Sequence, residues 1–170
     1  MKSKRLNNLG KINRDKTLNF TWDNKKLRGF EGDSLSSALL ANNIGIVGRS
    51  FKYHRPRGIF SSGVEESGAL VTIGSKDRRD PNVRATTQEL YDGLKASGQN
   101  AFPNVNFDLG GINNYIGRFF AAGFYYKTFM GIPPFEWGKG TTIWMLFEKL
   151  IRKAAGMGSA SRLPDPDSYE

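Results

Sequence analysis

The stretch that decides the fold is residues 17–47, which read TLNFTWDNKKLRGFEGDSLSSALLANNIGIV. Within it, residues 17–22 and residues 26–30 alternate polar and apolar side chains, as half-buried strands do. Asp23 and Asn24 lie between these segments and are typical turn residues. The two segments are therefore predicted to form a β-hairpin.

A helix is predicted directly after the hairpin. Asp33 or Ser34 is suited to cap its first turn, because a short polar side chain can accept a hydrogen bond from a free backbone N–H there. An apolar stripe at helical spacing follows, made of Leu35, Ala38 and Leu39. Asn43 or Gly45 is suited to end the helix.

Further strands are predicted beyond this helix, at residues 44–47 and 69–73. Residues 82–94 are ambiguous, since their first half favours a strand and their second half could be helical. The order hairpin, helix, strand, long loop, strand, strand predicts an α+β fold. We expect a small mixed sheet wrapped around one packed helix, the β-grasp arrangement of ferredoxins, over residues 15–98, with a basic arm over residues 1–14.

The chain changes character after about residue 98. A helical pattern of apolar residues appears over residues 112–120, and a second apolar stripe follows Thr141 and Thr142. We expect a mostly helical, aromatic-rich extension over residues 99–157, and a linker rich in Ser, Pro and Asp over residues 158–170. The excess of aromatic side chains predicts a buried contact with another domain or subunit.

Composition limits the chemistry that the chain can perform. It has 170 residues, of which 38% are hydrophobic, enough for one domain with a core and an appendage. It has no cysteine, which excludes disulfides, thiolate nucleophiles and cysteine-ligated metals. The single histidine, His54, leaves no zinc site of the usual kind. No apolar run suits a membrane helix and no secretory signal is visible, so we expect a cytoplasmic protein.

Positive charge is unevenly distributed. The net charge is +9, and residues 1–28 hold nine basic and two acidic side chains. A second basic stretch is predicted to face an anionic group, either a cofactor phosphate or an acidic patch of a partner. Its candidate residues are Arg49, Lys52, Tyr53, His54, Arg55 and Arg57. The alternative is a structural loop whose Arg side chains pair with Glu65 and Glu66, and for His54 itself we expect a structural role.

Residues 56–69, PRGIFSSGVEESGA, occupy the position of the cluster loop in a β-grasp ferredoxin. They resemble the loop P-R-G-x-x-C-G-x-G-x-C-x-x-C in iron–sulfur subunits of amino-acid and opine dehydrogenases. The match puts Ser61, Glu66 and Ala69 at three cysteine positions, and Thr86 at the fourth. Four thiolates must converge to hold two irons. None of these four residues supplies one, so neither a 2Fe-2S cluster nor another metal is expected.

A longer resemblance covers nearly the whole chain from about residue 14. Residues 48–59, GRSFKYHRPRGI, are similar to the alpha subunit of heterotetrameric sarcosine oxidase, as are the segments 82–86, 89–94, 107–110, 122–130 and 164–170. The resemblance implies a complex of four subunits that oxidatively demethylates sarcosine to glycine. In that family FAD, FMN and NAD serve as cofactors, and folate accepts the one-carbon unit.

The resemblance also implies an architectural role without catalytic residues. In the family a dinucleotide-binding domain follows this region and the beta subunit oxidises the substrate. We therefore expect a truncated or split alpha subunit that binds no cofactor by itself. Its expected partners are the remainder of alpha and the beta subunit, with gamma and delta as further candidates. Two alternatives stay open: a subunit of a related amino-acid or opine dehydrogenase, disfavoured by the missing cysteines, and a free-standing basic module that binds nucleic acid.

Overall fold

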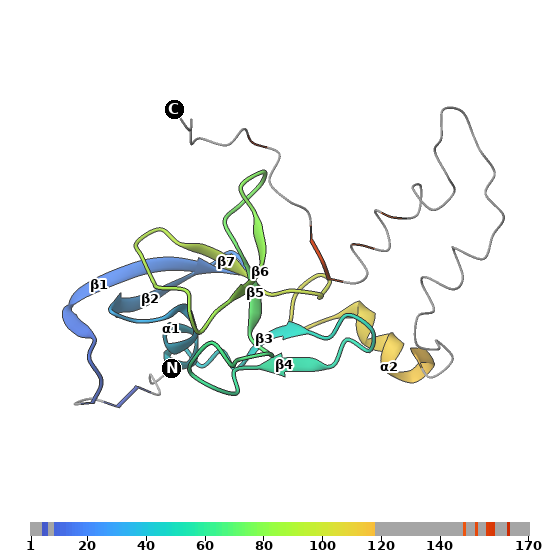
Figure 1. Cartoon of the computed structure of the whole chain (residues 1–170), viewed down its shortest axis with the longest axis horizontal. Helices are drawn as coiled ribbons and strands as arrows, with labels where there is room; N and C mark the ends of the chain where they lie inside the picture. Colours follow the sequence, from blue (N-terminus) through green and yellow to red (C-terminus); the bar gives the residue numbers. More distant parts are fainter. Residues whose placement is uncertain are drawn as a thin grey trace.

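The computed structural model describes residues 5–6, 9–117, 148, 152, 156–158 and 163. Its elements along the chain are β1 (Asn13–Trp22), β2 (Lys25–Glu31), α1 (Leu35–Ala41), β3 (Ile46–Arg49), β4 (Pro56–Gly58), β5 (Leu70–Ile73), β6 (Asp80–Arg84), β7 (Lys95–Ser97), the 3-10 helix η1 (Leu109–Ile112) and α2 (Asn113–Ile116). Figure 1 shows the β3–β4 pair between the main sheet and α2.

The main sheet is mixed, with the strand order β2-β1-β7-β5-β6. β1 runs antiparallel to β2 but parallel to β7, which lies near the end of the domain in the sequence. β5 pairs antiparallel with both β6 and β7. A hairpin beside a late parallel strand, with one helix packed on the sheet, is the β-grasp arrangement, so the predicted α+β fold class is confirmed.

The turn between β1 and β2 has the geometry that its residues favour. Asp23 and Asn24 have φ angles of 45° and 67°, so both central residues are left-handed. Such a two-residue turn matches the twist of the flanking strands, and Asp and Asn tolerate it better than most residues. The Asp23 carboxylate also accepts a hydrogen bond from Gly98 N–H at 3.0 Å, which ties the hairpin to the end of β7.

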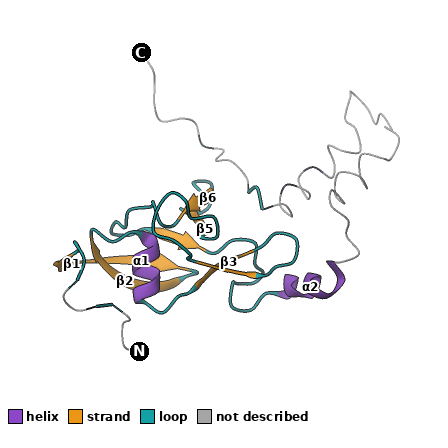
Figure 2. Ribbon diagram, turned by 60° about the horizontal axis from the view of Figure 1, so that its bottom comes forward, coloured by secondary structure: helices purple, strands orange, loops and turns teal. Residues whose placement is uncertain are grey.

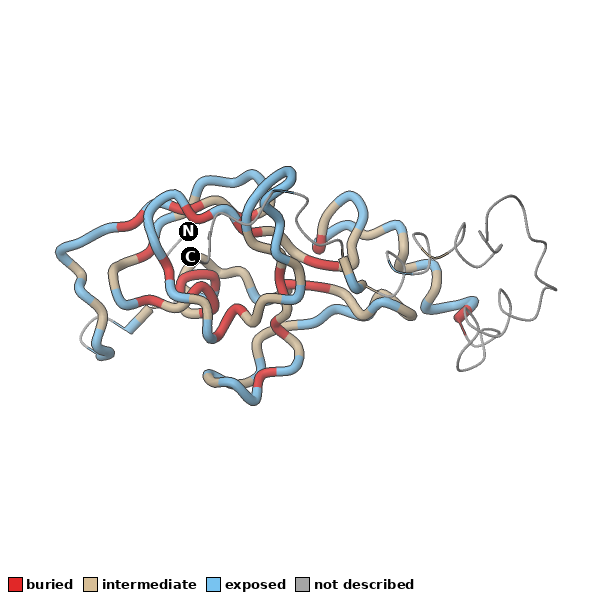
Figure 3. The backbone as a smooth tube through the Cα atoms, turned by 45° about the horizontal axis from the view of Figure 1, so that its top comes forward, coloured by how far each residue is buried: buried red, intermediate tan, exposed pale blue. Residues whose placement is uncertain are grey.

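Helix α1 supplies the centre of the core. Ser34 is its N-cap, and the Ser34 hydroxyl accepts a hydrogen bond from Ser37 N–H at 3.2 Å. The apolar side of α1 packs on the sheet, and Figure 2 shows this helix lying against the strands. The core residues at this contact include Phe20, Trp22, Leu35, Ala38, Leu39 and Leu94. Buried segments gather in this body while the loops at its rim are exposed (Figure 3).

The structure differs from the sequence prediction in how some strands pair. The strand expected at residues 44–47 appears as β3, but it pairs with β4 in a separate two-stranded sheet. The ambiguous residues 82–94 end β6 and then form turns. The helix expected over residues 112–120 begins as η1 and α2. The rest of that helix lies outside the described residues, as do nearly all of the later extension and the linker.

Candidate functional site

The loop that joins β4 to β5 is built around one buried carboxylate. Glu66 is only 1% exposed. Both oxygens of its carboxylate accept hydrogen bonds from backbone N–H groups. The donors are Phe60 and Ser61, at 2.5 and 2.6 Å from Oε2, and Gly68 and Ala69, at 2.5 and 3.2 Å from Oε1. We call residues 59–69 with this carboxylate the Glu66 loop.

The surroundings of Glu66 keep it charged. Burial by itself raises the pKa of the carboxyl group, because desolvation penalises the charged form. The backbone N–H groups of Ser61, Gly68, Phe60 and Ala69 outweigh burial and lower the pKa of Glu66 to about 2. Convergent N–H groups of this kind form an anion-binding concavity. The Glu66 loop is therefore an anion site that is filled by its own side chain.

The structure places the four degenerate cluster positions at this loop. Ser61 Oγ lies 3.5 Å from Glu66 Oε2, and Ala69 donates its N–H to the same carboxylate. Thr86 Oγ1 donates to the carbonyl of Gly63 at 2.8 Å, which closes the loop from the strand side. The four side chains are two hydroxyls, a methyl group and a carboxylate. They supply no thiolate, so the residues present do not fit a 2Fe-2S cluster.

The alternative in which Arg side chains pair with Glu65 and Glu66 is wrong. Both carboxylates accept hydrogen bonds from backbone N–H groups instead, and Glu65 Oε1 lies 3.2 Å from the nitrogen of Gly63. Arg84 does reach this loop, but it donates to the backbone carbonyl of Glu66 at 2.8 Å.

Arg49, the first residue of the predicted basic site, is turned inward. Its Nε and Nη2 atoms donate to the carbonyl of Val105 at 2.9 and 2.7 Å, and Nη1 donates to the carbonyl of His54 at 3.1 Å. Arg49 therefore fastens its loop to a segment that lies 56 residues further along the chain. Its guanidinium is occupied by the protein's own carbonyl groups.

His54 is also held from within the domain. Its Nδ1 lies 2.8 Å from Oδ2 of Asp108, whose side chain is 1% exposed. Burial raises the pKa of Asp108, but N–H groups of Phe102 and Gly110 together with His54 lower it below its ordinary value. This carboxylate partner was missed by sequence reasoning because it lies 54 residues away from His54. The signal that could have found it is the Asp-Leu-Gly-Gly sequence, typical of a capped helical turn.

The remaining predicted site residues lie nearer the surface. Lys52 Nζ lies 4.9 Å from the centre of the Tyr53 ring, and the Arg55 guanidinium lies 4.7 Å from it, both within cation–π range. Arg55 and Arg57 are exposed. The structure thus divides the predicted set, with Arg49 and His54 serving the fold and the others lying on or near the surface.

The Glu66 loop carries two exposed apolar side chains. Phe60 is 97% exposed and Val64 is 72% exposed, although both belong to a loop whose backbone is fixed by hydrogen bonds. Arg57 lies three residues before Phe60 and is exposed as well. We call Arg57, Phe60 and Val64 the loop face. It was not predicted from the sequence.

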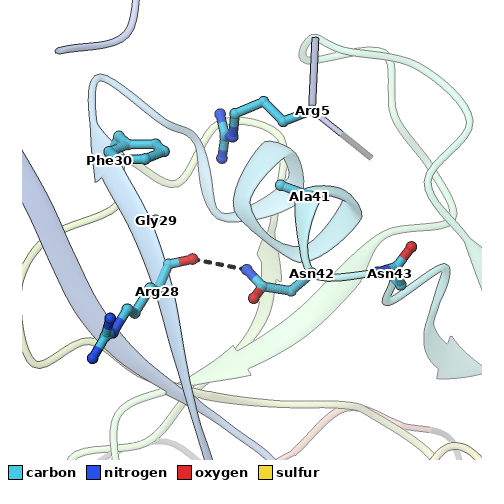
Figure 4. A pocket seen from close by; sticks show the side chains of 7 residues that line it. All are labelled: Arg5, Arg28, Gly29, Phe30, Ala41, Asn42 and Asn43. Atoms are coloured by element: carbon cyan, nitrogen blue, oxygen red, sulfur yellow. Dashed lines mark hydrogen bonds between the residues drawn. The ribbon is translucent and has the colours of Figure 1, made fainter. Parts of the chain in front are cut away.

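A pocket of about 260 Å³ lies where residue 5 meets β2 and the end of α1 (Figure 4). The guanidinium of Arg5 donates to both carboxylate oxygens of buried Asp33, at 2.8 and 2.7 Å, and stands 5.2 Å from the Phe30 ring. Asn42 Nδ2 donates to the carbonyl of Arg28 at 2.8 Å. These groups are engaged in holding the fold together, and we assign no ligand to the pocket.

Two other kinds of feature are absent from the described part of the chain. Among those residues, no group of three or more His, Asp or Glu side chains is placed to hold a metal ion. Their helices also include none that is long and apolar enough to span a membrane.

Comparison with known families identifies the family of the domain. Residues 15–101 match the profile of the 2Fe-2S iron–sulfur cluster binding domain. The chain belongs to this family. It is a member without the cluster, because the family's ligand positions carry no cysteine and Glu66 fills the anion site of the loop.

Curated relatives agree with the resemblance drawn from the sequence, which is confirmed. Sarcosine oxidase subunit alpha of Rhizobium meliloti (strain 1021) is 52% identical over 170 residues, covering 100% of this chain and 16% of that protein. The same subunit of Corynebacterium sp. (strain U-96) is 47% identical over 90 residues, covering 51% of this chain and 9% of that protein. The chain therefore spans only a small part of the relatives that it matches.

A solved structure with some likeness is L-proline dehydrogenase from P. horikoshii. It is 27% identical, with a TM-score of 0.43, and the match covers 54% of this chain and 17% of that one.

Proposed function

We propose that this chain is a structural module of a sarcosine oxidase alpha subunit, within a flavin-dependent complex that oxidatively demethylates sarcosine to glycine. The observation that carries the proposal is the 52% identity over all 170 residues with an alpha subunit of that name. Because the chain spans 16% of that relative, substrate oxidation and the FAD, FMN and NAD sites would belong to other parts of the complex. We place this complex in the cytoplasm.

The geometry supports an architectural rather than a catalytic role. Ferredoxin domains transfer electrons through their cluster, and here a carboxylate fills the loop. His54 and Arg49, the residues of the basic loop best suited to chemistry, are engaged with Asp108 and with backbone carbonyls. The proposed division of the chain is an arm over residues 1–14, this module over 15–98, an extension over 99–157 and a linker over 158–170.

The loop face is suited to contact the remainder of the alpha subunit. An aromatic side chain held out on a fixed loop resembles the anchors that dominate protein interfaces. Phe60 is 97% exposed, so its burial in a partner would remove much apolar surface from water. Arg55 and Arg57 are positively charged, so we expect carboxylates around the site on the partner that receives Phe60.

The test is a pull-down of the full tagged chain from its native cell extract, with mass spectrometry of the partners and an absorbance spectrum of the complex. Alpha-remainder and beta-subunit sequences together with a flavin spectrum support the proposal. A colourless chain without those sequences refutes it, and subunits of an amino-acid dehydrogenase would point to that class instead.

The loop face is tested in the same experiment with Phe60→Ser. We expect the variant to bind about 30-fold more weakly, as truncating an interface anchor typically costs about 2 kcal/mol. Tyr91→Ser is the matched control, because Tyr91 is an exposed aromatic residue in another part of the domain, at 52% exposure. Equal losses in both variants would argue against a specific role of the loop face.

A further inference from the structure

A cluster loop that binds no cluster must satisfy its inward-pointing N–H groups in another way. Its backbone curls around a central group, so several N–H groups point inward, and buried N–H groups without acceptors are costly. In this chain the N–H groups of residues 60, 61, 68 and 69 converge on one point. The sequence offers no thiolate ligand to hold a cluster at that point. Something else must accept these hydrogen bonds.

Glu66 accepts all four of these hydrogen bonds. Each of its oxygens takes two N–H groups. Among the described residues, no Lys, Arg or His side chain forms an ion pair with it, whereas buried Asp33 has Arg5 and buried Asp108 has His54. Backbone N–H groups alone can stabilise a buried carboxylate. They form the kind of concavity that binds phosphates and iron–sulfur centres elsewhere.

The close packing of the loop fits this arrangement. A Cβ atom added to Gly68 would lie 2.9 Å from the carbonyl oxygen of Gly58 and 3.1 Å from Glu66 Oε1. Backbone atoms cannot yield easily there, so glycine is required for the backbone to approach the carboxylate.

The strand side of the loop is also closed without metal. Thr86, at the fourth cluster position, donates its hydroxyl to the carbonyl of Gly63 at 2.8 Å. Arg84 donates to the carbonyl of Glu66 at the same distance. These two hydrogen bonds link the end of β6 and the turn after it to the Glu66 loop.

We propose that the Glu66 carboxylate takes the structural place of the iron–sulfur cluster, as the anion around which residues 59–69 fold. Its four N–H donors are oriented as they would be around a bound anion, and its covalent attachment to the loop makes the site independent of iron supply. The carboxylate thereby fixes the backbone that carries Phe60. This inference concerns the chain alone, so it stands or falls separately from the assignment to an oxidase complex.

The first test measures amide hydrogen exchange in the full chain by NMR. In Glu66→Ala, we expect the four donor amides to exchange at least about tenfold faster, as expected for a lost hydrogen bond, while amides of the β1–β2 pair keep their protection. Sodium acetate, which replaces the deleted CH₂–COO⁻ group, is expected to restore protection. Sodium chloride at the same ionic strength should not. Glu65→Ala is the matched control and should leave the four amides unchanged.

Unchanged exchange in Glu66→Ala, or acetate that acts no better than chloride, would overturn the proposal. Should that variant fail to fold, the wild-type chain supplies the second measurement. NMR couplings across hydrogen bonds should connect the nitrogens of residues 60, 61, 68 and 69 with the side-chain carboxyl carbon of Glu66. Their detection supports the proposal, and their absence overturns it.

Discussion

Removal of the Arg5 guanidinium should destabilise the domain by about 3 kcal/mol. Asp33 is fully buried, and it accepts hydrogen bonds from both Arg5 nitrogens, from Phe30 N–H at 2.9 Å and from Ser37 Oγ at 2.8 Å. Removing one partner of a buried ion pair typically costs about 3–5 kcal/mol. Arg5 is itself 15% exposed, so water can partly replace it, which favours the lower end of that range.

The perturbation is Arg5→Met, which keeps an apolar stem beside Phe30. The free energy of unfolding would be measured by urea titration of the full chain, followed by far-UV circular dichroism. Lys16→Met is the control, since Lys16 pairs with Glu31 at the surface, where both side chains are well exposed. Exposed pairs contribute little, so this variant should unfold like the wild type.

The pH dependence gives the same experiment a second readout. Burial raises the pKa of Asp33, but Arg5, Phe30 N–H and the Ser37 hydroxyl lower it below its ordinary value of 3.8. A lowered pKa means that the stabilisation is present above 3.8 and is lost as the pH falls through the folded-state value. The difference between wild type and Arg5→Met should therefore shrink below that pH. A loss under about 1 kcal/mol at pH 7, or a loss that is independent of pH, would refute the reasoning.

Glu66→Gln should lower the free energy of unfolding by about 2 kcal/mol at neutral pH, because an amide turns an N–H donor toward two of the four N–H groups. That loss should diminish from pH 4.5 down to about 2, where the wild-type carboxylate gains its proton, and a constant loss in urea titrations across this range would contradict the prediction. Gly110→Ala should cost about 1–3 kcal/mol and weaken the His54–Asp108 contact, because the new Cβ would lie 2.2 Å from the His54 ring. Gly111→Ala, with open space at its Cβ, is the control, and equal thermal stability of the two variants would exclude the predicted clash.

Much of the fold could be predicted from local sequence signals. The hairpin combines two alternating segments with Asp23 and Asn24, and α1 combines an apolar stripe with the Ser34 cap. The short strands β4 and β7 have three residues each, too few for an alternating pattern to be visible. The partner of β3 was not predictable either, because pairing depends on the path of the loop between β3 and β4.

The candidate site was less predictable for a related reason. Matching to the cluster motif placed Glu66 at a ligand position, but the sequence alone does not show that its carboxylate accepts the hydrogen bonds of the loop. Glu66 points inward to four N–H groups, while Glu65 stays at the surface. The partners of Arg49 and His54, which are Val105 and Asp108, could not be predicted because they lie more than fifty residues away in the sequence.

The Glu66 loop has the length of the cluster motif, although it carries none of the cysteines. A domain that needed only a packed core could have shortened the Glu66 loop once the cysteines were gone, since long ordered loops cost conformational entropy. Instead the loop is retained at the length of the cluster motif, with a buried carboxylate at its centre. The inner groups that would carry electrons have been replaced, whereas the outer side still presents Phe60 and Val64 to the surroundings. A loop that is fixed from within and carries an exposed aromatic residue suits the docking role that we propose, because docking depends on the outer surface of the loop and not on the atoms inside it.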